Sequence, residues 1–291
     1  MKRTGLFSLI FLLLISANTW AADTLKPFRL VSSAPGEMGS AIADAKSKLE
    51  SGGFKVVGEY APYGDAHVIV VTHDELLSVA GQSDHGGYGA VIRVSVTNNG
   101  GNVEVAYADP DYWMAAFRMG DSSGVAAKMA SAMGSSEPFG SAEGLTEKKL
   151  RKYHYMAFMP YFDDDDKLGS FSSHSEALAK VNANLAGGGN GLSKVFEVAV
   201  PGKEEVLIGV AIGEGTGADQ SIMSKIDLSE PKHTAHLPYA VLVSGKDVYS
   251  QAGKFRIALS FPDLSMAGKG SFMEIMDAPG AIKEALETLA K

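Results

Sequence analysis

Histidines and carboxylates gather in two loops of the chain, each between a β-branched strand and the hairpin that follows it. The chain has seven histidines, and four of them lie in these loops: His73, His85, His233 and His236. Imidazole and carboxylate groups that lie close together can bind Zn²⁺, Cu²⁺ or haem iron. The alternative is four solvated surface histidines, because neither loop has the tight ligand spacing of a known metal motif. The sequence therefore names a candidate metal or haem site and leaves both interpretations open.

A second group with possible chemistry follows the first predicted hairpin. Asp111, Tyr112 and Trp113 come directly after Asp109-Pro110. A proline at the second position of a turn explains the Asp-Pro-Asp pattern. A carboxylate beside two aromatic side chains can also line a ligand-binding cleft. We expect a turn here, with Asp111, Tyr112 and Trp113 as candidate ligand-binding residues.

Methionines form three close pairs along the chain. The pairs are Met129/Met133, Met156/Met159 and Met273/Met276. Thioether sulfur suits Cu(I), but packing in the core is the interpretation that the pattern favours. Met129 and Met133 lie on the apolar face of a predicted helix. Met156 and Met159 have an odd spacing, which directs two side chains to opposite faces of a strand.

Composition narrows the classes of function. The formal charge of −8 repels phosphate backbones, so nucleic acid is not an expected partner. The sequence has no cysteine, which excludes disulfides, and no Gly-x-Ser-x-Gly elbow. No recognised catalytic pattern is therefore present.

The first 21 residues read as a secretory signal sequence. Lys2 and Arg3 precede an apolar run, and Thr19-Trp20-Ala21 offers a small-x-small cleavage site. The apolar run is shorter than a membrane span needs, and no later segment is long and apolar enough to cross a bilayer. We expect cleavage after residue 21 and a mature protein in the periplasm, with plain secretion as the alternative.

Two matching series of elements follow the signal sequence. We expect a first α+β repeat over residues 25–134, a linker over 135–150 and a second repeat over 151–291. Each repeat is predicted to run strand, helix, two strands, loop, hairpin, helix. In the first repeat these elements are 28–31, 38–49, 54–60, 67–72, 90–97, 103–108 and 125–133. In the second they are 155–161, 177–185, 195–200, 206–212, 239–244, 255–260 and 282–289.

Short matches support a duplication. Lys55-Val56-Val57 corresponds to Lys194-Val195-Phe196, and Pro110-Asp111 corresponds to Pro262-Asp263. The pattern predicts an α+β fold of two similar domains. Each would be a mostly antiparallel sheet with helices on one face, and the two would pack as a pseudo-dimer.

The first repeat resembles a widespread family of small prokaryotic domains of unknown function. The resemblance rests on Gly-Phe-Lys-Val-Val at residues 53–57, the hairpin, and Asp109-Pro110 after the last strand. It covers most of residues 25–135 and reaches the second half only through the internal repeat, where Ser260-Phe261-Pro262 departs from the Asp-Pro pattern. The resemblance implies an α+β fold and pairing of domains through their sheets. It implies no reaction and no ligand.

Three hypotheses for function follow. The leading one is a non-enzymatic periplasmic binding or accessory protein, with a metal or small molecule at the inter-domain face or in the two loops. The second is an enzyme with one active and one degenerate repeat. The third is a structural partner of another periplasmic protein or of a second copy of the chain.

Overall fold

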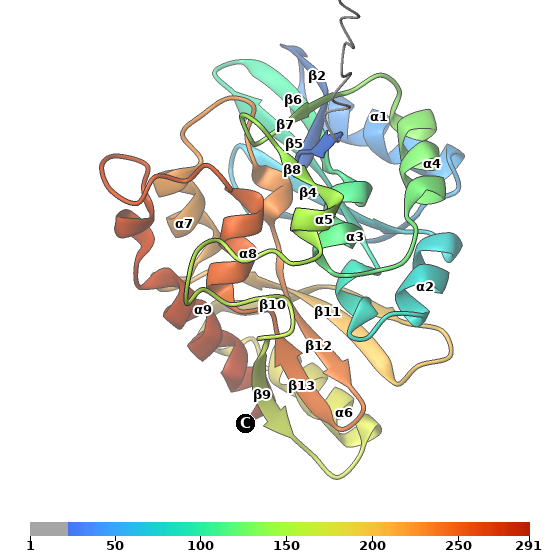
Figure 1. Ribbon diagram of the computed structural model, residues 1–291, viewed down its shortest axis with the longest axis vertical. Coiled ribbons are helices and arrows are strands. Elements are labelled where there is room, and N and C mark those ends of the chain that lie inside the picture. The colour runs from blue at the N-terminus through green and yellow to red at the C-terminus, as the bar shows by residue number, and fades with distance from the viewer. Residues whose placement is uncertain (1–22) are drawn as a thin grey trace, which may run out of the picture.

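The computed structural model describes residues 23–291, so the predicted signal sequence lies outside the described residues. The described chain is an α+β structure built on two mainly antiparallel sheets, one in the upper and one in the lower part of Figure 1. We call residues 23–150 the first half and residues 151–291 the second half.

The first half contains eight strands, five α-helices and one 3₁₀ helix among the described residues. The strands are β1 Thr24–Leu25, β2 Phe28–Pro35, β3 Lys55–Tyr63, β4 Ala66–Thr72, β5 Ile92–Asn99, β6 Asn102–Ala108, β7 Glu137–Phe139 and β8 Leu145–Thr146. The helices are α1 Met38–Ser51, α2 Asp74–Gly81, η1 Gly86–Gly89, α3 Pro110–Ala116, α4 Ser123–Met133 and α5 Glu147–Leu150. The predicted linker, residues 135–150, therefore contains ordered elements, and β7 joins the first sheet beside β2.

The second half contains five strands, four α-helices and four 3₁₀ helices among the described residues. The strands are β9 Asp166–Ser170, β10 Leu192–Ala199, β11 Glu205–Ile212, β12 Tyr239–Ser244 and β13 Asp247–Ser250. The helices are α6 His174–Ala186, η2 Gly189–Gly191, α7 Asp219–Ile226, η3 Thr234–His236, α8 Gly253–Ser260, η4 Phe272–Ile275, α9 Ala278–Glu287 and η5 Thr288–Ala290.

Both sheets place their strands in the same order. The first sheet runs β3-β4-β5-β6-β2-β7 and the second runs β10-β11-β12-β13-β9. In both orders the strand that precedes the first long helix, β2 or β9, lies beside the strand that closes the hairpin, and β7 is an additional edge strand of the first sheet. The edge strands β3 and β10 each carry a bulge, at Val57 and at Val195. The hairpin predicted around Asn98-Asn99-Gly100-Gly101 is confirmed, because Gly100 and Gly101 have φ angles of 61° and 95° between β5 and β6.

Residues 255–260, predicted to be a strand paired with 239–244, form helix α8 instead. The partner of β12 is β13, and two residues separate these strands. Phe255, Arg256 and Leu259 are all buried. The segment therefore has no exposed face whose period would separate a helix from a strand.

Residues 155–161, predicted to be the first strand of the second half, form no strand. The Met159 N–H donates to the Met156 carbonyl at 3.0 Å, and Phe158 has a left-handed φ of 66°. Such a turn breaks the extended backbone. The first strand of the second half is β9, which begins at Asp166.

Asp109-Pro110-Asp111 begins helix α3 and is not an isolated turn. The Asp109 carboxylate accepts the Asp111 N–H at 3.0 Å, and Pro110 occupies the first turn of the helix. The predicted equivalence with Pro262-Asp263 is wrong, because α3 follows its hairpin directly whereas Pro262 comes after α8.

The two halves share a core and meet along the edge strands β3 and β10. Phe196, Leu207 and Leu242 of the second half belong to the same buried cluster as the core of the first half. Gly58 lies at the contact, where a Cβ would stand 2.1 Å from the Val195 carbonyl oxygen. Only glycine allows this close approach of two backbones.

Each half also covers part of the other half's sheet, an arrangement we call the loop exchange. From the first half, η1 packs on β11 and β12, and from the second half, η3 packs on β4, β5 and β6. The Gly87 N–H donates to Glu205 Oε2 at 3.0 Å, and the Lys232 N–H donates to Glu104 Oε2 at 2.7 Å. Both glutamates are buried, so each exchanged loop is fixed by a hydrogen bond to a carboxylate of the opposite sheet.

Candidate functional site

The four loop histidines lie in four different surroundings. His73 caps α2 through its Nδ1, while His85 pairs with Asp165 of the second half at 2.8 Å, which raises the pKa of His85. His236 is fully buried, and His233 borders a cleft. Across residues 23–291, no three His, Cys, Asp or Glu side chains lie close enough to hold a metal ion. The arrangement gives the predicted shared metal or haem site no support.

Tyr112 and Trp113 are buried contacts between the halves and not cleft walls. The Tyr112 hydroxyl donates to the Leu259 carbonyl at 2.9 Å, and the Trp113 ring faces the Arg256 guanidinium at 4.3 Å. Asp111 is half-buried and lines a separate surface hollow. The structure therefore does not bring these three side chains into one site.

A cleft of about 500 Å³ opens between the two halves. The first half contributes Lys26 and residues 138–142 to its walls. The second half contributes residues 226–233, which lead from α7 to η3, and residues 261–270, which follow α8. Clefts between domains are common places for ligands to bind.

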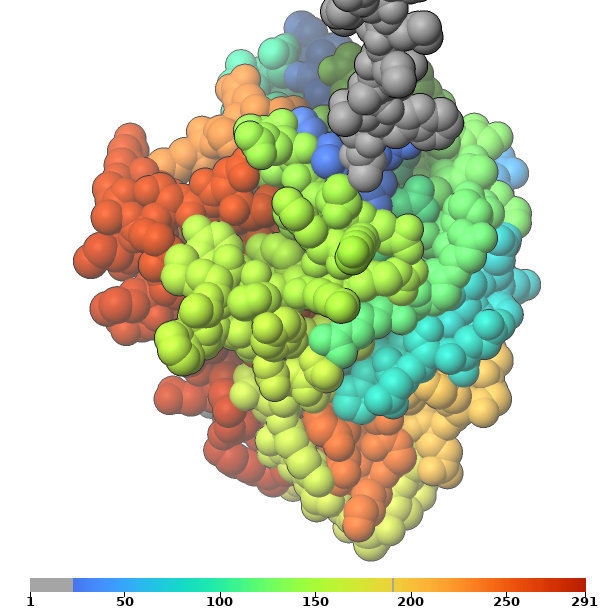
Figure 2. Space-filling view, in the orientation of Figure 1, coloured from blue at the N-terminus to red at the C-terminus, as the bar shows by residue number. Residues whose placement is uncertain are grey.

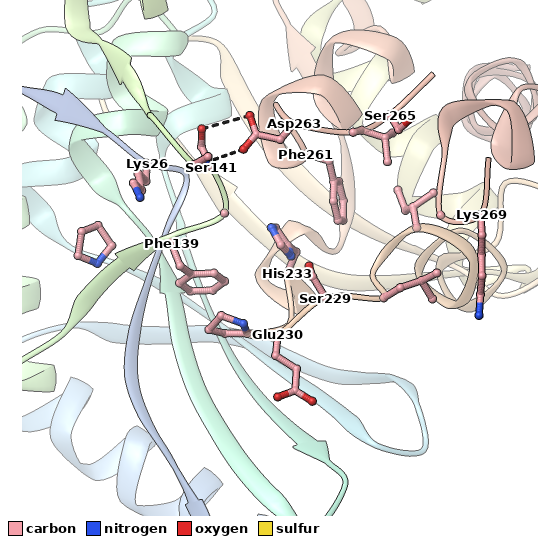
Figure 3. A pocket seen from close by; sticks show the side chains of 18 residues that line it. Lys26, Phe139, Ser141, Ser229, Glu230, His233, Phe261, Asp263, Ser265 and Lys269 are labelled. Atoms are coloured by element: carbon pink, nitrogen blue, oxygen red, sulfur yellow. Dashed lines mark hydrogen bonds between the residues drawn. The ribbon is translucent and has the colours of Figure 1, made fainter. Parts of the chain in front are cut away.

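Asp263 joins the two sides of the cleft. Its carboxylate accepts the Ala142 N–H at 2.6 Å and the Ser141 hydroxyl at 3.4 Å (Figure 3). These contacts connect the segment after β7 to the segment after α8. They therefore hold one edge of the cleft at a fixed width.

His233 lies in the middle of the cleft and is held rigidly. Its Nδ1–H donates to Asp227 Oδ1 at 3.0 Å, because a carboxylate can only accept. Asp227 also accepts the His233 backbone N–H at 2.9 Å. The imidazole ring stacks on Phe261 with centroids 4.7 Å apart and meets Phe139 edge-on at 5.6 Å (Figure 3). A buried carboxylate and two aromatic rings thus fix the orientation of this imidazole.

The second ring nitrogen of His233 is directed at Gly140. A Cβ built on Gly140 would lie 3.2 Å from His233 Nε2. Gly140 has a φ of 93°, in the region that favours glycine. Among the described residues, no side chain or backbone group is hydrogen-bonded to this Nε2. The absence of a side chain at position 140 leaves one hydrogen-bonding site of the ring open.

Lysines stand on opposite sides of the cleft. Figure 3 shows Lys26 on one side and Lys269 on the other, with His233 between them. The carboxylate of Glu230 is directed away from His233 in the same view, and Asp263 is occupied by its hydrogen bonds. The charged side chains that line the cleft are therefore two lysines and two carboxylates, and the lysines lie on either side of His233.

A buried polar network lies on the far side of Phe261. His236 Nδ1 is hydrogen-bonded to the Ser260 hydroxyl at 2.6 Å, and Nε2 to the Tyr239 hydroxyl at 2.9 Å. Arg256 donates to Ser260 at 3.0 Å and to the His236 carbonyl. Burial, and then the nearby Arg256, lower the pKa of His236 well below its usual value. This neutral imidazole has no free ring nitrogen, so the Ser260–His236 pair is a structural contact.

Two other buried groups between the halves lack full partners. Arg93 projects from β5 with its Nε unpaired, and burial lowers its pKa to about 10. Asp219 accepts the Tyr60 hydroxyl at 2.8 Å with Oδ2, while Oδ1 has no partner. Burial raises the pKa of Asp219 to about 7. These groups make the interface sensitive to charge.

The sequence named His233 but not the residues that give it a role. Asp227 lies six positions upstream of His233, and Phe261 follows helix α8. Neither spacing matches a short motif, and their approach depends on the path of η3 across the first sheet. Gly140 lies within the predicted linker. The nearest available signal was the grouping of His233 with carboxylates in one long loop.

Comparison with known proteins gives no match: no family model, curated protein or solved structure aligns with the chain. Within residues 23–291, no helix has the length and apolar character that a bilayer span requires.

Proposed function

We propose that the protein is a non-enzymatic binding protein that holds a small organic anion in the cleft between its halves. The observation that carries this proposal is His233, whose Nε2 faces the cleft over Gly140 while Nδ1 is held by Asp227. A rigid imidazole with one open nitrogen is a directional hydrogen-bonding group. Its position in a cleft suits ligand recognition.

The remaining walls define the ligand class. Lys26 and Lys269 flank the imidazole and attract a negatively charged group. A protonated Nε2 donates a hydrogen bond to a carboxylate, and a neutral one accepts from a hydroxyl or amide. Leu228 and Leu264 add apolar surface, which suits the hydrocarbon part of an organic acid.

Benzoate, benzamide and benzamidine provide a matched set of probes. They share a phenyl ring and carry a negative, neutral or positive group. We expect benzoate to shift the ¹³C and ¹⁵N resonances of the His233 ring and to bind more tightly than the other two. The measurement is nuclear magnetic resonance on protein with labelled histidine.

Two variants sharpen this test. His233→Gln should lose benzoate binding, whereas His174→Gln should retain it, because His174 begins α6, is hydrogen-bonded to the Gly245 carbonyl and does not line the cleft. Benzoate binding of equal strength by His233→Gln would exclude the cleft as the binding site. Failure of benzoate to bind up to its solubility limit would remove the anion proposal.

The dyad of His233 and Asp227 favours a second candidate, an enzyme that uses general acid–base catalysis. An aspartate that orients an imidazole is a recurring device for proton transfer. Hydrolysis of 4-nitrophenyl acetate is a probe, since imidazole promotes it. A rate in excess of background that falls in both His233→Gln and Asp227→Asn would support the enzyme. A rate unchanged by both substitutions would eliminate it.

We also propose that the two halves arose by duplication, that the protein is exported, and that it has a protein partner. The common strand order and the matching bulges support an origin of the two halves by duplication, with a pseudo-dimer as the result. Export to the periplasm and cleavage after residue 21 remain predictions, which the mass of the mature protein tests. A second periplasmic protein or a second copy of the chain is the proposed partner for an accessory role.

A further inference from the structure

Large exposed hydrophobic side chains are concentrated in one region of the described chain. They lie in residues 155–161, at Leu228 and in residues 264–276. The seven side chains are Met156, Phe158, Tyr161, Leu228, Met266, Met273 and Met276. Four of the seven are methionines, a polarizable residue that adapts its shape to what it contacts.

A cavity of about 220 Å³ lies within this region. Met156, Met159 and Met266 all line it, together with apolar walls from α8 and the chain that follows. The Tyr155 hydroxyl donates to the Leu264 carbonyl at 3.1 Å and so joins the two segments. Figure 2 shows the yellow-green segment around residues 150–165 against the orange-red segment around 260–276. Three thioethers from two distant parts of the sequence thus border one cavity.

The turn at residues 156–159 is what brings two of these methionines together. On the strand expected from the sequence, Met156 and Met159 would point to opposite faces. The Met159 N–H instead donates to the Met156 carbonyl, and Phe158 turns the chain with its left-handed backbone. Both side chains then reach the same cavity. Met156 and Met266 remain 44% and 46% exposed, so solutes can reach them.

We propose that Met156, Met159 and Met266 form a binding site for a single Cu(I) or Ag(I) ion. Thioether sulfur is a soft ligand that selects Cu(I) over harder divalent ions. The chain has no cysteine, so no thiolate competes for the ion. Lys254 is the one charged residue lining the cavity, and its ammonium disfavours Zn²⁺ or Cu²⁺ more strongly than a monovalent ion.

A thioether site has a distinctive response to pH. Thioethers carry no proton that a metal must displace, whereas imidazole and thiolate ligands lose a proton before they bind. Affinity for Ag(I) should therefore be the same at pH 5 and pH 8. This response separates the proposed site from any that uses histidine.

The test is titration of the mature protein with Ag(I), and with Cu(I) under ascorbate in competition with bicinchoninate. One ion should bind per chain, with a sulfur-only first shell in X-ray absorption spectra. Met156→Leu, Met159→Leu and Met266→Leu should each weaken binding, and the triple variant should lose it. Met129→Leu, in the buried face of α4, is the matched control and should bind like the wild type.

Leucine keeps the volume of methionine, and circular dichroism checks that the variants fold. Three results overturn the proposal: no competition with bicinchoninate, binding that persists in the triple variant, or affinity that falls between pH 8 and pH 5. Binding of an apolar dye to this cavity without metal binding also overturns it, because the methionines would then serve as an apolar surface.

Discussion

Asp219 makes the stability of the protein depend on pH in an unusual direction. The residue begins α7, is 1% exposed and reaches across to Tyr60 on β3 of the first half. One carboxylate oxygen has no partner, so ionisation in this position is unfavourable. Burial raises the pKa from its usual 3.8 to about 7. The folded protein therefore holds this proton in a pH range where the unfolded chain has released it.

The magnitude follows from the two pKa values. The pKa of Asp219 is higher in the folded protein than in the unfolded chain. The stability that its protonated carboxyl gives the folded state is therefore fully present below pH 3.8 and is lost as the pH rises to 7. Each unit of pKa difference corresponds to about 1.4 kcal/mol, so the total loss is about 4 kcal/mol. Asp219→Asn cannot ionise, and its amide oxygen can still accept the Tyr60 hydroxyl. The variant should therefore avoid the loss.

Urea unfolding followed by circular dichroism measures the effect. The free energy of unfolding of Asp219→Asn, relative to wild type, should increase by about 4 kcal/mol from pH 4 to pH 8. Tyr60→Phe removes a hydrogen-bond donor to the carboxylate, so it should raise the pKa of Asp219 further. The loss of stability should then extend to higher pH than in the wild type. A wild-type-to-variant difference that stays constant across this range would refute the burial of a carboxyl with one unpaired oxygen at this interface.

Two further predictions concern contacts between the halves. Gly58→Ala should lower the free energy of unfolding by about 3 kcal/mol, because its Cβ would meet the Val195 carbonyl at 2.1 Å. Gly64→Ala, with nothing within 4 Å of its Cβ, should have little effect in the same urea experiment. His85→Gln should destabilise more at pH 5.5 than at pH 8, because the hydrogen bond to Asp165 raises the pKa of His85, and its stabilisation is lost as the pH rises through that value. Equal destabilisation at both pH values would contradict the ion pair.

The sequence predicted those helices and strands whose conformation depends on neighbouring residues in the chain. The hairpin between β5 and β6 follows from Gly100 and Gly101, which supply the positive φ angles that its turn requires. Helix α1 follows from its apolar period, with Ala45 and Leu49 buried as the pattern requires. The α+β class followed from these elements.

The features that the sequence did not predict depend on contacts between the halves. Helix α8 is buried at every position except Lys254, which removes the period that marks a helix. His233 was visible as a candidate, but its role depends on Asp227 and on Phe261, which only the folded path of η3 brings together. Met156 and Met159 were assigned to opposite faces because the turn between them had no strong marker in the sequence.

Because of the loop exchange, the first half is synthesised before the second but cannot complete its fold without it. The first sheet is complete in sequence at β7, and α1 of the same half packs on β4, β5 and β6. The other element that packs on these three strands is η3, which is made about a hundred residues later. A newly made first half must therefore wait, with one sheet face uncovered, until residue 236 has been added. Contacts of such long sequence separation slow folding, and unpaired strand edges invite association with other chains. The nascent chain thus passes through a vulnerable interval that ends only when the second half arrives.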